Sequence, residues 1–238
     1  TPTKNIVKDD AVSEVEYSEG GKGHKQQASF VVSTIPINEL PKLFEPAAPK
    51  AVLDAAAQIK WRSIILVYAI VNRNRLFDDN WRFFPEAEYC FNRVSEQKGF
   101  NPELVPKGKT VVCAEITCDF MDEKWRATDV ELYGKVIVDL EKANICKKSE
   151  VMEYFTVKLK DPYPVYSIGY AGNLKTILDY LDGIKGIITV GRMGLFNYNN
   201  SDHCIDMARK AADYVLSGKP ISDWQAMREE FKKYVIVD

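Results

Sequence analysis

One stretch of the chain, residues 186–216, restricts the possible fold more than any other. It begins with Ile187–Val190, a short apolar run rich in β-branched residues, which is typical of a buried strand. Gly191 and Gly194 follow and bracket Arg192 in a tight turn, where backbone without a side chain can approach a ligand closely. Aromatic and amide residues, 196–200, come next and lead into a predicted helix, so the order is strand, glycine-and-arginine turn, helix N-terminus.

The predicted helix starts at Asn200–Ser201–Asp202. Small and aliphatic residues then recur at helical spacing and predict its buried face: Ile205, Ala208, Ala212 and Val215. The N–H groups and the positive dipole end of such a helix suit an anionic or electron-rich ligand, and Arg192 can add a planar fork of donors. The spacing fits an ordinary β–loop–helix connection with a structural arginine equally well.

Composition restricts the partners. The 238 residues include 32 basic and 34 acidic side chains, a net charge of −2, so we expect no partnership with nucleic acid or an anionic membrane. The longest apolar run, Ile64–Val71, is too short to span a bilayer. Five scattered cysteines and two histidines predict reduced thiols in a cytoplasmic protein, with neither a disulfide framework nor a metal site.

The string GRMGLFNYNNSDHCIDMA, residues 191–208, resembles the C-terminal flavin-contacting segment of the flavin-dependent amine oxidase superfamily. That superfamily includes protoporphyrinogen oxidases, phytoene desaturase-like enzymes and, more distantly, UDP-galactopyranose mutases. The resemblance implies that Arg192 approaches the pyrophosphate of FAD and that residues 200–203 lie near the ribityl chain and the pyrimidine edge. Reduced flavin carries negative charge at that edge, which a helix N-terminus stabilises.

A second segment carries the same resemblance. Strand-like runs at Val12–Tyr17 and Gln26–Thr34 flank a glycine-rich loop and predict a hairpin. Residues 29–36, SFVVSTIP, resemble the superfamily's hairpin that returns to a Rossmann sheet and ends in a Thr-x-Pro turn beside the cofactor. The residues that the resemblance assigns to the FAD site are Thr34, Pro36, Gly191, Arg192, Met193, Gly194, Phe196, Tyr198, Asn200, Ser201, Asp202 and His203.

The middle of the chain reads as a mainly antiparallel sheet with at least one helix. The predicted strands are Trp61–Asn72, Trp81–Phe84, Tyr89–Val94, Thr110–Thr117 and Val151–Lys160. Thr128 is a predicted N-cap for a helix to about Asn144. Its predicted buried residues are Val130, Tyr133, Ile137 and Leu140. Two further helices are predicted at Leu174–Leu181 and Ile221–Val237, the latter with Trp224, Met227, Phe231 and Tyr234 on one stripe.

The expected fold class is therefore α+β. The resemblance implies that two ranges belong to an FAD-binding Rossmann-like domain. Residues 1–45 supply its hairpin, and residues 166–238 supply its return strand and helices. Residues 46–165 form the inserted substrate-binding domain. The chain carries no GxGxxG after a strand, although the superfamily binds the ADP half of FAD with that fingerprint. We therefore expect the C-terminal part of a longer protein, which does not bind FAD alone and which associates with its N-terminal portion or with itself through an exposed sheet edge.

Substrate contacts are predicted at fewer positions. Arg93, in a Phe-Asn-Arg triplet that resembles a short motif of relatives, can meet an anionic group of a small-molecule substrate; it equally fits a surface arginine. Tyr163, Tyr166 and Tyr170 are candidates for a pocket wall, or close a sheet edge. No protein group is identified as catalytic, because no nucleophile–base or paired-carboxylate arrangement is visible.

Three functions remain open. The first is an FAD-dependent oxidoreductase, in which hydride passes from a C–N or C–C centre to flavin N5. The second is a sugar-nucleotide mutase that resembles UDP-galactopyranose mutase. The third is a non-catalytic binding module. The mutases favour an aspartate-methionine pair where this chain has Asn200-Ser201 or Asp202-His203, which favours the first function. Substrate, electron acceptor and oligomeric state are not predicted.

Overall fold

A computed structural model describes residues 1–236. The chain forms two compact units, each described here by itself. The first unit comprises Thr1–Lys60 and the chain from Tyr163 onward, and the second comprises Trp61–Pro162. The second unit is thus an insertion in the first. Within the described residues, no helix is long and apolar enough to cross a membrane.

The first unit holds two sheets. Its strands are β1 (Pro2–Lys8), β2 (Ala11–Glu19), β3 (Lys22–Gln27), β4 (Val31–Ser33), β5 (Phe44–Glu45) and β11 (Ile187–Thr189). One sheet has the order β3-β2-β1-β5, in which β2 and β3 form a hairpin around the glycine-rich loop, as predicted. The second predicted strand, Gln26–Thr34, is wrong as one element, because it is divided between the end of β3 and β4, which lie in different sheets. The other pairs β4 with β11 in parallel, Val31 opposite Ile187. Two segments more than 150 residues apart in sequence therefore lie side by side.

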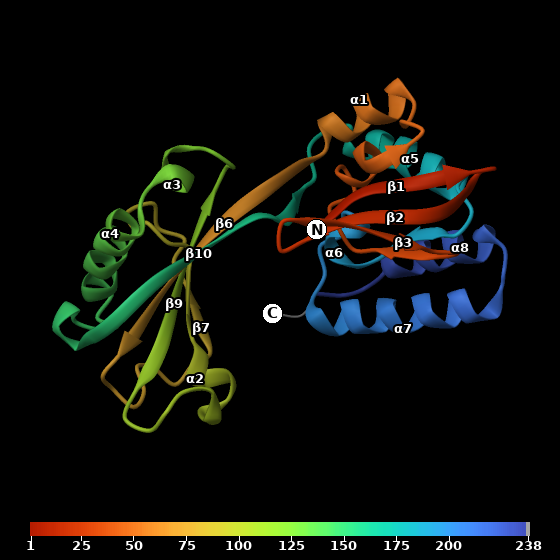
Figure 1. Ribbon diagram of the computed structural model, residues 1–238. Coiled ribbons are helices and arrows are strands. Elements are labelled where there is room, and N and C mark those ends of the chain that lie inside the picture. The colour runs from red at the N-terminus through yellow and green to blue at the C-terminus, as the bar shows by residue number, and fades with distance from the viewer. Residues whose placement is uncertain (237–238) are drawn as a thin grey trace. The chain divides into compact units, whose positions relative to one another are not determined.

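The helices of the first unit cover these strands. They are η1 (Leu40–Leu43), α1 (Lys50–Gln58), α5 (Tyr170–Asp182), α6 (Gly191–Gly194), α7 (Ser201–Ser217) and α8 (Ile221–Phe231). Figure 1 shows α1 and α5 on one side of the strands and α7 and α8 on the other. Since α1 packs against α5, residues 50–58 belong to the first unit. The boundary therefore lies later than the predicted start of the middle domain at residue 46.

The buried face of α7 differs from the predicted one. Met207, Ala211 and Tyr214 are buried against β11 and α8, whereas Ile205 is 71% exposed. Both sets of residues recur at helical spacing, so periodicity could not choose between them. The set with the larger side chains packs against Trp224 and β11. Helix α8 ends at Phe231, earlier than predicted, and the predicted end at Val237 lies outside the described residues.

The second unit is built on one five-stranded sheet with the order β10-β6-β9-β8-β7. Its strands are β6 (Lys60–Val71), β7 (Trp81–Phe83), β8 (Arg93–Glu96), β9 (Thr110–Cys118) and β10 (Val151–Val165). The pairs β6–β9, β8–β9 and β7–β8 are antiparallel, as predicted for this region. The shorter elements are α2 (Gln97–Phe100), η2 (Pro102–Leu104), α3 (Glu123–Arg126) and η3 (Lys148–Glu150).

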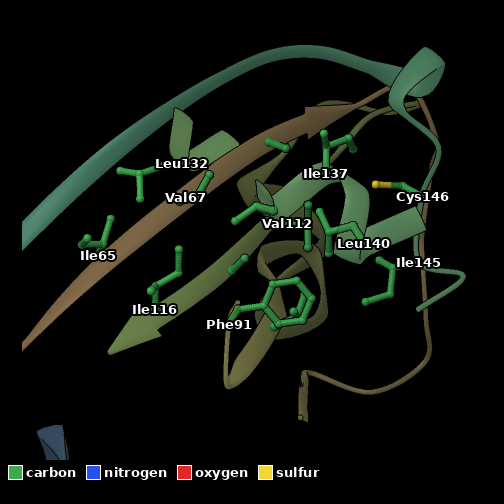
Figure 2. Packing of buried hydrophobic residues seen from close by; sticks show 14 of the residues in the cluster. Ile65, Val67, Phe91, Val112, Ile116, Leu132, Ile137, Leu140, Ile145 and Cys146 are labelled. Atoms are coloured by element: carbon green, nitrogen blue, oxygen red, sulfur yellow. The ribbon is translucent and has the colours of Figure 1, made fainter. Parts of the chain in front are cut away.

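One face of this sheet is covered by α4 (Asp129–Lys142). Alternate residues of β6 and β9, such as Val67 and Val112, point at Leu132, Ile137 and Leu140 of the helix (Figure 2). The period of two in a strand puts these residues on one face, so their burial follows directly from the alternation. This layer forms the core of the second unit.

Helix α4 begins where the sequence predicts. Thr128 is the N-cap of a capping box: the Thr128 N–H donates to the Glu131 carboxylate (2.8 Å), and the Glu131 N–H donates to Thr128 Oγ1 (3.3 Å). Such a cap stabilises a helix by about 1 kcal/mol. The predicted buried face is wrong at Val130, which is 68% exposed, because Leu132 and Val136 face the sheet instead.

The strand predicted at Tyr89–Val94 starts later, at Arg93. Before it, the chain is held in a loop, because the Cys90 N–H donates to Asp139 of α4 (2.7 Å). The rings of Tyr89, Phe91 and Phe84 pack against one another there, with centroids 5.0–5.7 Å apart. Aromatic residues that suit a strand by propensity are thus used to cover one end of the core.

Candidate functional site

The ends of β4 and β11 bring the two predicted flavin-contacting segments together. Val190 N–H donates to the Ser33 carbonyl (2.9 Å), and Ile37 N–H donates to the Met193 carbonyl (3.0 Å). A Cβ placed on Gly194 would lie 2.9 Å from the Ser33 oxygen. Glycine is therefore required at 194 for the close approach of the two chains. The predicted proximity of residues 34–36 and the glycine turn is confirmed.

Gly191–Gly194 forms one short helical turn, α6, at the end of β11. Gly191 has φ +82°, a conformation that favours glycine, and a Cβ built there meets no heavy atom within 4 Å. The backbone at this strand end is thus bordered by open space. A ligand can approach it as closely as the sequence predicts.

Arg192 lies in α6, and its side chain is bound to the loop that links α6 to α7. Its Nε donates to the carbonyl oxygen of Asn199 (2.9 Å), and one Nη donates to the same oxygen. The guanidinium carbon also lies 5.3 Å from the ring centre of Tyr163 and 4.8 Å from that of Tyr198. The arginine therefore closes the loop and keeps a cation beside two phenol rings.

Asn199 is a site residue that sequence reasoning missed. It is fully buried, and besides accepting from Arg192 through its backbone it accepts from the Cys204 thiol through Oδ1 (3.1 Å). An amide directly before the helix N-cap was the available signal, but only its burial shows that it organises the loop. Cys204 serves here as a donor to that amide.

The start of α7 is capped as the sequence predicts. Asn200 is the N-cap, and the Asn200 N–H donates to Nδ1 of His203 (3.2 Å). The His203 ring stacks on Tyr234 with centroids 4.6 Å apart and an interplanar angle of 6°. Ser201 and Asp202, in the first turn, are exposed. The N–H groups of this turn and the positive end of the 17-residue helix form an anion-favouring end.

The three predicted tyrosines and two further aromatic residues form one cluster in the first unit, which we call the aromatic cluster: Tyr163, Tyr166, Tyr170, Phe196 and Tyr198. Neighbouring ring centres are 4.9–5.8 Å apart. The Tyr198 N–H donates to the Tyr166 hydroxyl oxygen (2.8 Å), and burial raises the pKa of Tyr166. The Tyr166 hydroxyl is therefore protonated near neutral pH, and its bond to Tyr198 supports the loop.

Arg93 lies in the second unit, in β8. Its Nε and an Nη donate to the two carboxylate oxygens of Glu115 in β9, at 2.8 and 2.9 Å. Glu115 is 8% exposed, and the Arg93 guanidinium carbon lies 5.8 Å from the ring centre of Phe83. The arginine is thus a partner of a buried carboxylate, which the sequence alone did not reveal.

Other chemistry is limited. No group of three or more His, Cys, Asp or Glu side chains in residues 1–236 has the arrangement of a metal site. Burial, with Asp139 beside it, raises the pKa of the Cys90 thiol to about 12, and burial raises that of Cys113 to about 12. Such thiols are protonated at neutral pH and poor nucleophiles.

Residues 1–172 match the family described as flavin containing amine oxidoreductase. The chain belongs to this family. The match covers most of the chain and stops before the glycine turn, so it is independent of the motif at residues 191–208. No curated protein matches the chain in sequence.

Solved structures share the fold. The chain resembles reduced UDP-galactopyranose mutase (19% identity, TM-score 0.76, 93% of this chain and 47% of that one). It also resembles a putative protoporphyrinogen oxidase from Exiguobacterium (18% identity, TM-score 0.66, 92% of this chain and 47% of that one). A triple mutant of putrescine oxidase is similar as well (13% identity, TM-score 0.62, 92% of this chain and 48% of that one). The chain thus spans about half the length of these relatives.

Proposed function

We propose that this chain supplies part of the FAD site of a flavin-dependent oxidoreductase. The observation that carries the proposal is the meeting of an open glycine turn, an arginine and the N-terminus of α7 at the ends of β4 and β11. These groups fit the anionic and electron-rich parts of FAD, since the Gly191 backbone is accessible and the helix end favours negative charge. Family membership supports the same cofactor.

Each part of the site has a proposed task. The proposal keeps the set that the resemblance implies around the cofactor: Thr34, Pro36, Gly191, Arg192, Met193, Gly194, Phe196, Tyr198, Asn200, Ser201, Asp202 and His203. Within that set, Arg192 adds positive charge beside the pyrophosphate, while its bonds to the Asn199 carbonyl hold the loop in place. The first turn of α7 lies near the pyrimidine edge and stabilises negative charge there. The flavin, when bound, supplies hydride acceptance from a C–N or C–C centre.

The proposal also covers contacts with the substrate. The aromatic cluster offers flat, uncharged surfaces that can orient a small-molecule substrate. Arg93 is a weaker candidate for an anionic substrate group than the sequence predicts, because its fork is already engaged by Glu115. The second unit is the proposed substrate-binding domain, and the first is the proposed FAD-binding part.

The test uses the longest protein in which this chain occurs, purified with its flavin. Arg192→Ala should weaken FAD retention on dialysis by about 1.5–3 kcal/mol, the worth of a charge-assisted hydrogen bond. Arg209→Ala is the matched control, since Arg209 is an exposed arginine of α7 paired only with acids of its own helix in the described chain. Equal FAD retention in both variants contradicts the assignment of Arg192.

The same preparation separates the alternatives. An oxidoreductase releases an oxidised product from a C–N or C–C substrate. A mutase, the alternative, interconverts a UDP-hexose after dithionite reduction and shows no net oxidation. Absence of the flavin absorbance bands from the purified protein identifies the third possibility, a non-catalytic binding module.

A further inference from the structure

A cavity of about 660 Å³ lies in the first unit between α5 and α8. Its walls are largely apolar: Leu174 and Leu178 come from α5, Phe231 comes from α8, and Leu195 and Phe196 come from the chain after α6. This volume falls within the range of about 300–1,000 Å³ for pockets that bind small molecules. Between α5 and α8 the lining includes only residues 195–197, and it contains neither glycine of α6 nor any residue of α7. It is therefore distinct from the glycine turn.

Every charged side chain that lines the cavity is paired with another that lines it. The pairs are Lys175–Asp179 (2.5 Å), Arg228–Asp182 (2.6 Å) and Lys232–Glu229 (2.6 Å). The Arg228–Asp182 pair is bidentate and nearly buried, and it ties α8 to α5. A charged ligand would have to compete with an ion pair that already exists, whereas an uncharged ligand would not.

One wall of the cavity is aromatic. Tyr166, Tyr170 and Phe196 all line it, with ring centres 4.9–5.8 Å apart and interplanar angles of 42–89°. Rings inclined to one another present both a face and an edge, which suits a flat partner. The Tyr170 hydroxyl makes no hydrogen bond within residues 1–236, and Asn197 uses its amide nitrogen on the Phe231 carbonyl (3.3 Å). The wall thus offers a hydroxyl and an amide oxygen to a ligand.

We propose that this cavity is a second binding site, which takes an uncharged, largely aromatic small molecule bearing one hydrogen-bonding group. Three of its lining residues, Tyr166, Tyr170 and Phe196, belong to the aromatic cluster that is proposed above to orient the substrate, so the two proposals share this wall, but binding in the cavity requires no flavin. The site also contacts the loop between α6 and α7, because Tyr166 lines the cavity and accepts the Tyr198 N–H. Occupancy of the cavity is therefore connected to the loop that holds Arg192.

The test uses two fluorescent probes that share one ring system, with the 238-residue chain. N-phenyl-1-naphthylamine is uncharged, and 1-anilinonaphthalene-8-sulfonate is the same molecule with an added anionic group. The uncharged probe should bind saturably at one equivalent, and the sulfonate should bind at least tenfold more weakly. Tyr170→Phe should weaken binding of the uncharged probe about five- to tenfold, the effect of one hydrogen bond.

A matched pair of variants locates the probe. Ala226→Phe adds a ring at an exposed alanine of the cavity lining and should abolish binding without disturbing the fold, as circular dichroism checks. Ala212→Phe adds the same ring at an exposed alanine of α7, outside the lining, and should leave binding unchanged. Equal affinity for both probes, or binding that survives Ala226→Phe, overturns the proposal. Absence of saturable binding also overturns it and leaves the cavity as a packing surface for another polypeptide segment.

Discussion

Arg192 donates two hydrogen bonds to the carbonyl oxygen of Asn199, seven residues further along the chain. The loop between them carries Phe196 and Tyr198 of the aromatic cluster and ends at the cap of α7. One side chain therefore sets the position of the helix end relative to the glycine turn. A residue predicted as a ligand contact is also the residue that closes the loop.

This double role predicts the behaviour of Arg192→Lys. A lysine keeps the positive charge, but its ammonium group cannot give two parallel hydrogen bonds from a planar fork or stack on phenol rings as a guanidinium does. Flavin retention in the holoprotein should fall between that of the wild type and that of Arg192→Ala. Hydrogen exchange should also be faster at the amides of residues 196–200, in the chain with or without flavin. Exchange rates equal to the wild type would show that the arginine does not hold the loop.

Two glycines with similar backbone angles should differ in their tolerance of alanine. Gly186 (φ +77°) and Gly191 (φ +82°) share the conformational cost of about 1–2 kcal/mol for a non-glycine residue. A Cβ at Gly186 would lie 2.5 Å from the Ser29 carbonyl oxygen, whereas one at Gly191 meets nothing within 4 Å. Gly186→Ala should therefore lower the free energy of unfolding in urea by more than Gly191→Ala does. Equal losses would show that the contact with Ser29 is not close.

The Arg93–Glu115 pair should be strongly coupled. Arg93→Ala leaves a carboxylate that is 8% exposed without its bidentate partner, and removal of one member of such a pair costs about 3–5 kcal/mol. The combined change Arg93→Met with Glu115→Leu should be far less destabilising, because no charge is left buried. Urea denaturation of the two single variants and the double variant measures the coupling. Additive losses would argue against a pair that acts as a unit.

The half-buried Cys90 and the buried Cys113 should both be inert in the folded chain. Burial raises the pKa of Cys90 and Cys113 to about 12, above the usual thiol value of 9.0. A raised folded pKa means that the stabilisation is complete below pH 9 and is lost as the pH rises from 9 towards 12. At pH 8, a thiol reagent such as dithionitrobenzoate should label both residues only after unfolding. Fast labelling of either residue in the folded protein would contradict this assignment.

The edge of the β4–β11 pair should mediate association. Within the described chain, β4 pairs with β11 alone, and Val32 is 45% exposed. Parallel sheets are normally covered on both faces and extended by further strands, so we propose that another polypeptide segment, or a second copy of the chain, pairs here. The isolated chain should self-associate in light scattering and bind no FAD.

A charge at this edge tests the same point. Val32→Lys should return the isolated chain to a monomer, since lysine on an edge strand opposes pairing. Ile168→Lys, a matched change at a fully exposed apolar residue outside the strands, should have no such effect. A monomeric wild-type chain that holds one equivalent of FAD would show that both expectations are wrong.

Local patterns predicted much of this protein. The alternation in β6 and β9, the cap at Thr128 and the order strand, glycine turn, helix at residues 187–202 follow from chemistry between near neighbours in sequence. The resemblance of residues 29–36 and 191–208 to one superfamily correctly placed the ends of β4 and β11 together. These features are set by side-chain period, propensity and capping, which act over a few residues.

Tertiary structure alone decided which residues of each apolar helix are buried and which group pairs with each arginine. The neighbouring elements buried Met207 of α7 and left Ile205 exposed, and in α4 they added Leu132 to the predicted face while Val130 stayed exposed. Arg192 donates to the Asn199 carbonyl, and Arg93 donates to Glu115 on the neighbouring strand. A periodic sequence indicates that a helix or strand has an apolar face. Which residues are buried, and which group pairs with a charged side chain, depends on packing against residues far away in sequence.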